Sequence, residues 1–89
     1  MIDPKHRVTI EYCVPSNYLE QAVGLAAEIL GAWAPVMIDV SLRTGSKGRF
    51  EVTLDDQLIF SKLKLHRFPK PGEMLKLAEP VLGPPIAWR

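Results

Sequence analysis

The stretch RVTIEYCVPSNYLEQAVGLAAEILGAW, residues 7–33, decides the fold, because its apolar period changes once within it. Residues 7–12 are rich in β-branched side chains and alternate in polarity, which is typical of a strand. Residues 13–17 break the alternation. Apolar side chains then recur at three- and four-residue steps, which predicts an amphipathic helix; they are Leu19, Ala22, Val23, Ala26, Ile29, Leu30 and Trp33. The stretch therefore predicts a strand, a short break and a helix.

Local signals set the ends of this helix. Asn17 is followed by Glu20 three residues later, which resembles a capping box with Asn in the cap role. Pro15 suits a first helical turn, where a missing amide costs little. Pro35 ends the helix, because the residue before a proline disfavours helical geometry.

The rest of the chain predicts three more strands and a second helix. Alternating or β-branched runs indicate strands at about 36–42, 49–54 and 57–61. Only Asp55-Asp56 separates the last two, which favours an antiparallel hairpin. Residues 73–78 predict a helix that is interrupted near Pro80. The order β-α-β-β-β-α gives a single α/β domain over residues 1–89. It has one mixed four-stranded sheet and two helices, the first two strands are parallel, and its order matches the core of the thioredoxin fold.

Composition limits the class of protein. The chain has 89 residues, of which 47% are hydrophobic and 24% are charged, as in a globular domain. It has no apolar run near the ~20 residues that span a bilayer, and no signal-peptide core at residues 1–6, so we expect no membrane partner. Its one cysteine excludes an internal disulfide and a thiolate metal site, and favours the reducing cytosol. Residues 43–70 carry seven basic and three acidic side chains, either a solvated face or an anion-binding one.

Cys13 is the candidate reactive residue. It follows the first strand and precedes the first helix, where ligand sites of α/β sheets occur. A helix N-terminus stabilises a thiolate, so we expect a thiol that is partly accessible and has a pKa below that of free cysteine. A lone cysteine is also often a buried, inert apolar side chain.

Four segments resemble the selenoprotein W, T and H family of thioredoxin-like proteins. They are residues 11–18 (EYCVPSNY), 48–52 (GRFEV), 58–62 (LIFSK) and 67–69 (RFP), and the resemblance covers about residues 7–78. It implies a thioredoxin-like fold, cytosolic redox chemistry and interaction with glutathione or protein thiols. Glutathione is the possible co-substrate, and no resident cofactor or metal is implied.

One residue departs from the family's pattern. The second redox position, a selenocysteine or cysteine in the family, is Ser16 here. A serine hydroxyl cannot resolve a mixed disulfide, so the resemblance extends to Cys13 as the attacking thiol but not to Ser16 as a resolving group. Ser16 either donates a hydrogen bond to the thiolate or caps the helix, and we favour the cap. The two candidate functions are a monothiol redox protein and a non-catalytic interaction module.

Other residues have simpler interpretations. The GSKG run at residues 45–48 fits a nucleic-acid-binding GXXG loop, but it joins two predicted strands and indicates a turn, so we expect no nucleic-acid partner. Alternation places Lys62 and Lys64 on one face, where with Arg67 they could attract glutathione carboxylates. Trp33 is expected in the core. The sequence leaves the oligomeric state and the role of Trp88 open.

Overall fold

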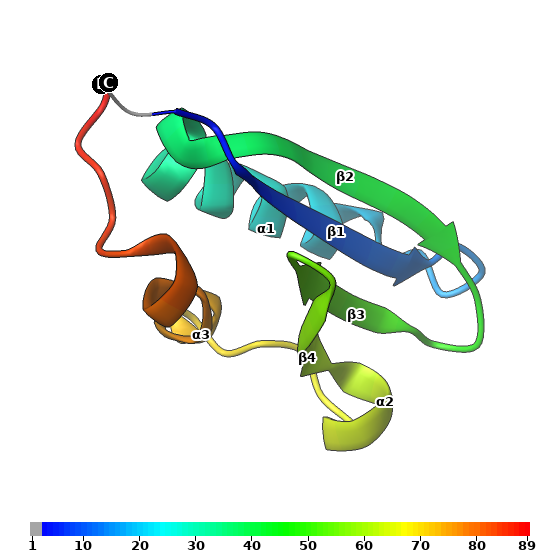
Figure 1. The fold of residues 1–89 in the computed structure, drawn as a ribbon. Helices are drawn as coiled ribbons and strands as arrows, with labels where there is room; N and C mark the ends of the chain where they lie inside the picture. The colour runs from blue at the N-terminus through cyan, green and yellow to red at the C-terminus, as the bar shows by residue number, and fades with distance from the viewer. Residues whose placement is uncertain (1–2) are drawn as a thin grey trace.

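Residues 3–89 of the computed structural model form a four-stranded sheet with helices on one of its faces (Figure 1). The elements follow the chain as β1 (His6–Cys13), α1 (Leu19–Trp33), a 3-10 turn (Ala34–Val36), β2 (Met37–Gly45), β3 (Phe50–Leu54), β4 (Gln57–Ser61), α2 (Lys62–Leu65) and α3 (Glu73–Leu82). None of the helices in residues 3–89 has the length and apolar character that crossing a bilayer requires.

The sheet has the order β2-β1-β3-β4, with β1 in the interior. β1 runs parallel to β2, as the sequence predicts, and antiparallel to β3. β3 and β4 form the predicted hairpin, and both residues of its turn, Asp55 and Asp56, have positive φ angles of 48° and 67°. Such a two-residue turn matches the twist of the flanking strands.

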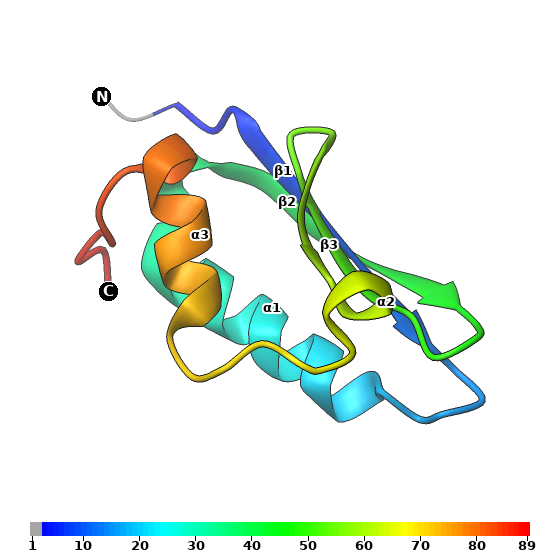
Figure 2. The ribbon, with the colours of Figure 1, turned by 90° about the horizontal axis from the view of Figure 1, so that it is seen from below.

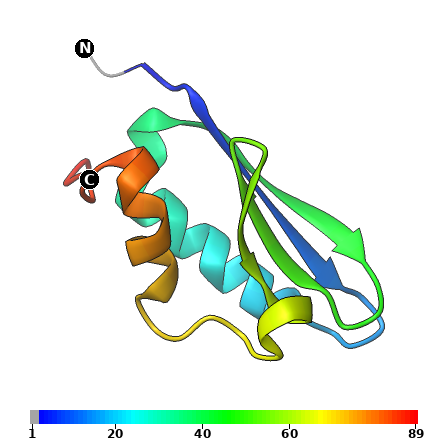
Figure 3. The ribbon, with the colours of Figure 1, turned by 60° about the horizontal axis from the view of Figure 1, so that its bottom comes forward.

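Both long helices lie on the same side of the sheet (Figures 2 and 3). Alternate residues of β1 and β3 face these helices and are buried, among them Val8, Ile10 and Val52. Trp33, at the end of α1, is fully buried and its indole N–H donates to the carbonyl of Gly83 at 2.9 Å. Its predicted place in the core is confirmed.

Three local predictions are wrong. β2 continues to Gly45, beyond the predicted end at residue 42. Residues 62–65 form the short helix α2, so Lys62 and Lys64 do not share the face of a strand. α3 passes through Pro80 to Leu82, because the buried Ala78 and Leu82 anchor its last turn on the core. The missing amide of Pro80 removes only one helical hydrogen bond.

The segment after α3 packs on the end of α1. The amide of Ile86 donates to the carbonyl of Ala32 at 2.7 Å, and the indole of Trp88 donates to the carbonyl of Gly31 at 2.9 Å. The second contact gives Trp88, whose role the sequence left open, a structural partner.

Candidate active site at the end of strand β1

Cys13 is the last residue of β1 and lies between two loops. Its backbone amide donates to the carbonyl of Arg49 at 2.8 Å, and the next amide, of Val14, donates to the carbonyl of Gly45 at 3.0 Å. Gly45 is the last residue of β2, and Arg49 is the residue before β3. Cys13 is therefore fixed by residues more than thirty positions later in the chain as well as by its own strand.

The loop after Cys13 folds back on the thiol. The amide of Asn17 donates to the carbonyl of Val14 at 2.9 Å, and Asn17 has a φ of 56°. Asn tolerates this left-handed conformation better than most residues. The reversal brings the hydroxyl oxygen of Ser16 to 3.1 Å from the sulfur of Cys13, within hydrogen-bond distance for sulfur.

The helix starts later than the sequence predicts. Tyr18 occupies the N-cap position and no side chain caps the helix, so the predicted capping box of Asn17 and Glu20 is wrong. Pro15 lies in the turn before the helix and not in its first turn. Ser16 is not the cap either, because its hydroxyl contacts the Cys13 thiol, which was the less favoured of our two interpretations.

The surroundings of Cys13 lower the pKa of its thiol. The largest cause is the hydrogen bond with Ser16, whose hydroxyl accepts from the thiol and would donate to the thiolate. Burial acts in the opposite direction, and the backbones of Gly48, Ser16 and Arg49 add smaller lowering contributions. The expected direction is confirmed, but the donors come from two loops and one side chain rather than mainly from the helix N-terminus.

The predicted accessibility of Cys13 is wrong. Only 1% of the residue is exposed, because the loop over residues 14–17 covers it while Ser16 and its neighbours face solvent. A reagent can reach the sulfur only after this loop moves.

A cation and two aromatic rings lie near the start of α1. The rings of Tyr18 and Phe68 meet edge to face, with centroids 4.7 Å apart. The ammonium of Lys62 lies 5.2 Å from the centre of the Tyr18 ring and 5.4 Å from that of Phe68. Of the three basic residues considered from the sequence, Lys62 is the one placed beside the loop that follows Cys13.

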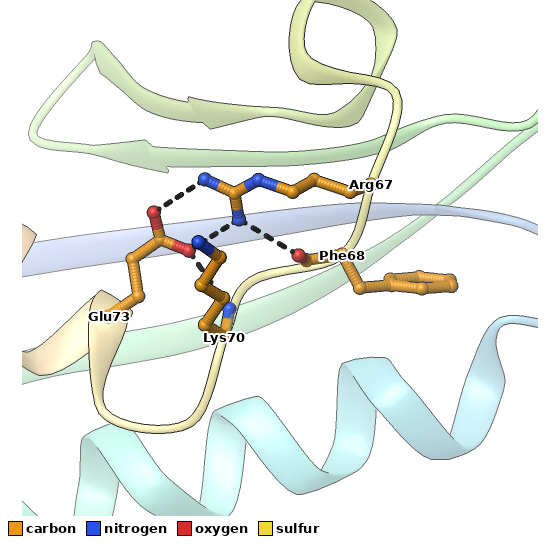
Figure 4. A network of polar contacts seen from close by, with 4 residues as sticks. All are labelled: Arg67, Phe68, Lys70 and Glu73. Carbon is orange, nitrogen blue, oxygen red and sulfur yellow. Dashed lines mark hydrogen bonds and ion pairs between the residues drawn. The ribbon is translucent and has the colours of Figure 1, made fainter.

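Arg67 has a different role from the one considered. Its guanidinium donates to both carboxylate oxygens of Glu73, at 2.7 and 2.9 Å, and to the carbonyl of Phe68 at 3.1 Å (Figure 4). The amide of Lys70 donates to the same carboxylate at 2.9 Å. Arg67 thus holds the segment between α2 and α3 in place and is engaged by a carboxylate of its own chain.

A cavity of about 350 Å³ lies between α1 and the segment that Arg67 holds. Its lining combines apolar side chains with a few polar ones, and consists of Gln21, Leu25, Glu28, Phe50, Phe68, Pro69, Lys70, Pro71 and Met74. Cys13 is not part of this lining, so the cavity and the thiol are separate features. No sequence pattern predicts the cavity, because segments distant in the chain form it.

The part of the chain that the structure describes has no candidate metal site. Residues 3–89 contain no cluster of three or more His, Cys, Asp and Glu side chains. His6 contacts Asp55 of the β3–β4 turn, and this contact lowers the pKa of the Asp55 carboxyl against the opposing effect of burial. Residues 46–48 of the GSKG run connect β2 to β3, as predicted, and Gly45 is the last residue of β2.

The sheet order and the helices on one face define a thioredoxin-like α/β protein. A selenoprotein W-related protein from Vibrio cholerae has the same fold, with a TM-score of 0.83 and 22% identity over 88% of this chain and 98% of that one. A protein of known structure from Bordetella parapertussis matches with a TM-score of 0.76 and 23% identity, over 84% and 95% of the two chains.

The family follows from the sequence match. The model of the Rdx family matches residues 7–79, and the chain belongs to this family. Its fold is also that of the selenoprotein W-related protein. It is 32% identical over 80 residues to migration and invasion enhancer 1 of Bos taurus, and 33% identical over 73 residues to the Mus musculus protein. The matches cover 83% and 78% of this chain but only 64% and 58% of those relatives.

Proposed function

We propose that Cys13 is the single redox thiol of a cytosolic protein and forms mixed disulfides with glutathione or with a partner protein. The observation that carries this proposal is the 3.1 Å contact between the Cys13 sulfur and the Ser16 hydroxyl, which lowers the pKa of the thiol. A thiolate is the form of cysteine that attacks disulfides, so a lower pKa raises the reactive fraction near neutral pH. Membership of the Rdx family supports the same chemistry.

The proposed step exchanges one disulfide for another. The Cys13 thiolate attacks one sulfur of oxidised glutathione, the glutathione S–S bond breaks, and a bond from Cys13 to that sulfur forms. The second glutathione leaves as a thiolate and takes a proton from water. No external oxidant is needed. Because the chain has no second cysteine, the adduct persists until another thiol attacks it.

Lys62 supports glutathione as one partner. Its ammonium lies over the Tyr18 ring, close to the loop that covers Cys13, and could attract a glutathione carboxylate. Lys64, on the same short helix, provides a matched control because it makes no such aromatic contact among the described residues. We expect Lys62→Ala to slow adduct formation with oxidised glutathione more than Lys64→Ala does.

Intact mass after treatment with oxidised glutathione tests the proposal. We expect one glutathione per chain for the native protein and none for Cys13→Ser. Ser16→Ala should raise the pH midpoint of iodoacetamide alkylation, because the thiolate loses its largest stabilising contact. Ser46→Ala, at an exposed serine of the neighbouring loop, should leave the midpoint unchanged.

The second candidate is a non-catalytic interaction module of the same fold. The observation that favours it is the 1% exposure of Cys13, which is typical of an inert buried thiol. If the folded native protein forms no adduct and is not alkylated, this second function is the better one.

A further inference from the structure

We propose that β2 is a self-pairing edge, and that two copies of this chain associate antiparallel across a twofold axis at Ser41, joining their sheets into one. β2 lies at the edge of the sheet and has nine residues, whereas the opposite edge strand, β4, has five (Figures 1 and 2). A long edge strand offers unpaired backbone groups to another strand. This inference is independent of the chemistry of Cys13.

The outer face of β2 carries two opposite charges. Asp39 and Arg43 are both exposed and lie two positions on either side of Ser41. Neither belongs to an ion pair within residues 3–89. Residues 40–42, between these two charges, include no proline and no charged side chain, which are the features that discourage pairing at an edge strand.

Charge selects one register among those that symmetry allows. A twofold axis perpendicular to the sheet keeps each side chain on its own face, so residues that meet across the axis are separated by an even number of positions. An axis at Asp39 or at Arg43 would oppose like charges. An axis at Val40 or Leu42 would place one of the two charges opposite Ser41. Only the axis at Ser41 places Asp39 of each copy opposite Arg43 of the other, which gives two ion pairs.

The same register extends a row of alternating charge. Within one chain, Asp39 is the neighbour of Arg7 on β1, and Arg43 is the neighbour of Glu11. Across the proposed axis the row reads Arg7, Asp39, Arg43 of the second copy and Glu11 of the second copy. Asp39 and Arg43 then each lie between two opposite charges, which favours pairing, whereas like charges directly opposite each other are destabilising.

The other face of β2 supplies apolar contact. Leu42 is the β1 neighbour of the buried Ile10, so it points to the helix side, yet it is 40% exposed because β2 is an edge strand. In the proposed register Leu42 meets Val40 of the second copy. Leu30 and Val23 of α1 are also exposed. They lie about 160° around the helix axis from Glu28 and Gln21, which line the cavity. Leu30 and Val23 are therefore on the side of α1 that faces away from α3.

This flank can contribute to the contact. α1 packs on β2 and β1, so its side away from α3 borders the β2 edge. Two copies joined at β2 would carry both α1 helices on the same face of the continuous sheet, with their exposed apolar flanks toward each other. Pairing therefore satisfies backbone, charged and apolar groups together.

Charge-reversal variants test both the association and its register. The measurement is sedimentation velocity over a range of protein concentrations. We expect Asp39→Arg alone and Arg43→Asp alone to weaken self-association about tenfold or more, because each opposes like charges across the axis. An equimolar mixture of the two variants should associate at least as well as the native protein, since each then meets its opposite. Circular dichroism of each variant verifies folding.

Cross-linking gives a readout of the register itself. In a Cys13→Ser background, Ser41→Cys should form an intermolecular disulfide under oxidation, because residues opposite each other in antiparallel strands lie about 4.5–5.5 Å apart at Cα. Thr44→Cys, also exposed on β2, should not, since its counterpart would lie about 20 Å away. A native protein that stays monomeric at all concentrations, or one that cross-links through position 44 and not 41, would overturn the proposal. The monomeric result would assign the edge to a strand of another protein.

Discussion

Ser16→Cys should convert the single thiol of this protein into a redox pair. The Ser16 oxygen already lies 3.1 Å from the Cys13 sulfur. A disulfide needs a sulfur–sulfur distance of about 2.05 Å, so the two atoms must approach by only about 1 Å. Ser16 is exposed, and the larger sulfur therefore meets little resistance from neighbouring groups.

The structure gives a magnitude for the effect of this bridge. It would close a loop of four residues, 13–16, for which the chain-entropy relation gives a stabilisation of about 2 kcal/mol. The oxidised variant should therefore resist urea more than the reduced variant by about this free energy. After treatment with oxidised glutathione it should lose two hydrogens and retain no glutathione, because the new thiol attacks the mixed disulfide on Cys13.

The assay is intact mass combined with urea unfolding, each with and without reductant. The native protein should keep one glutathione under the same treatment, and the double variant Cys13→Ser/Ser16→Cys serves as the control for reaction at position 16 alone. A single variant that retains a stable adduct and forms no internal bridge would refute the reasoning. Positions 13 and 16 would then lack the geometry of a redox pair, and the non-catalytic interaction module would become the better candidate function.

Three further predictions concern stability. The carboxyl of Glu73 has its pKa lowered to about 2, first by the Arg67 guanidinium and then by the Lys70 amide. Because the unfolded value is about 4.3, this contact stabilises the fold above that pH and is lost as the pH falls toward 2, so Glu73→Gln should flatten the acid limb of urea stability in this window. Trp33→Phe removes the indole donor to the Gly83 carbonyl and should cost about 1–3 kcal/mol, measured by urea unfolding. Glu51→Ala removes the acceptor of the first α2 amide and should cost about 0.5–2 kcal/mol in the same assay, as the loss of a helix cap does.

The main strands and the long helix could be predicted, because burial of one face of each element imposes a regular spacing of apolar residues on the sequence. The parallel pairing of the first two strands and the hairpin follow from the change of period and from the Asp-Asp turn. α2 could not be predicted, because KLKL alternates like a strand. Its helical turn depends on the hydroxyl of Ser61, which accepts from the Lys64 amide, and on the carboxylate of Glu51 from another strand. Contacts between distant residues leave no local pattern.

The position of the site could be predicted, but not its local structure. The place of Cys13 at the end of a strand follows from the pattern of residues 7–33. Its burial does not, because the loop over residues 14–17 folds back on the thiol while residues from a distant part of the chain hold the end of the strand. The contact with Ser16 depends on the left-handed conformation of Asn17, which turns the loop back before the helix begins. Helix-capping rules assume that the helix starts directly, and here it starts later.

Burial of Cys13 and the lowered pKa of its thiol are two consequences of one loop. The residues that shield the sulfur include the one whose hydroxyl stabilises the thiolate, so opening the loop for a reagent also releases part of that stabilisation. Under the proposed function, the observed rate is therefore the product of the open fraction and the intrinsic rate of an open, less acidic thiol. Small reagents that need a slight opening should report a lower alkylation midpoint than bulky ones. This coupling makes the thiol selective: a partner that binds the loop and keeps the Ser16 contact would react faster than free glutathione at the same concentration.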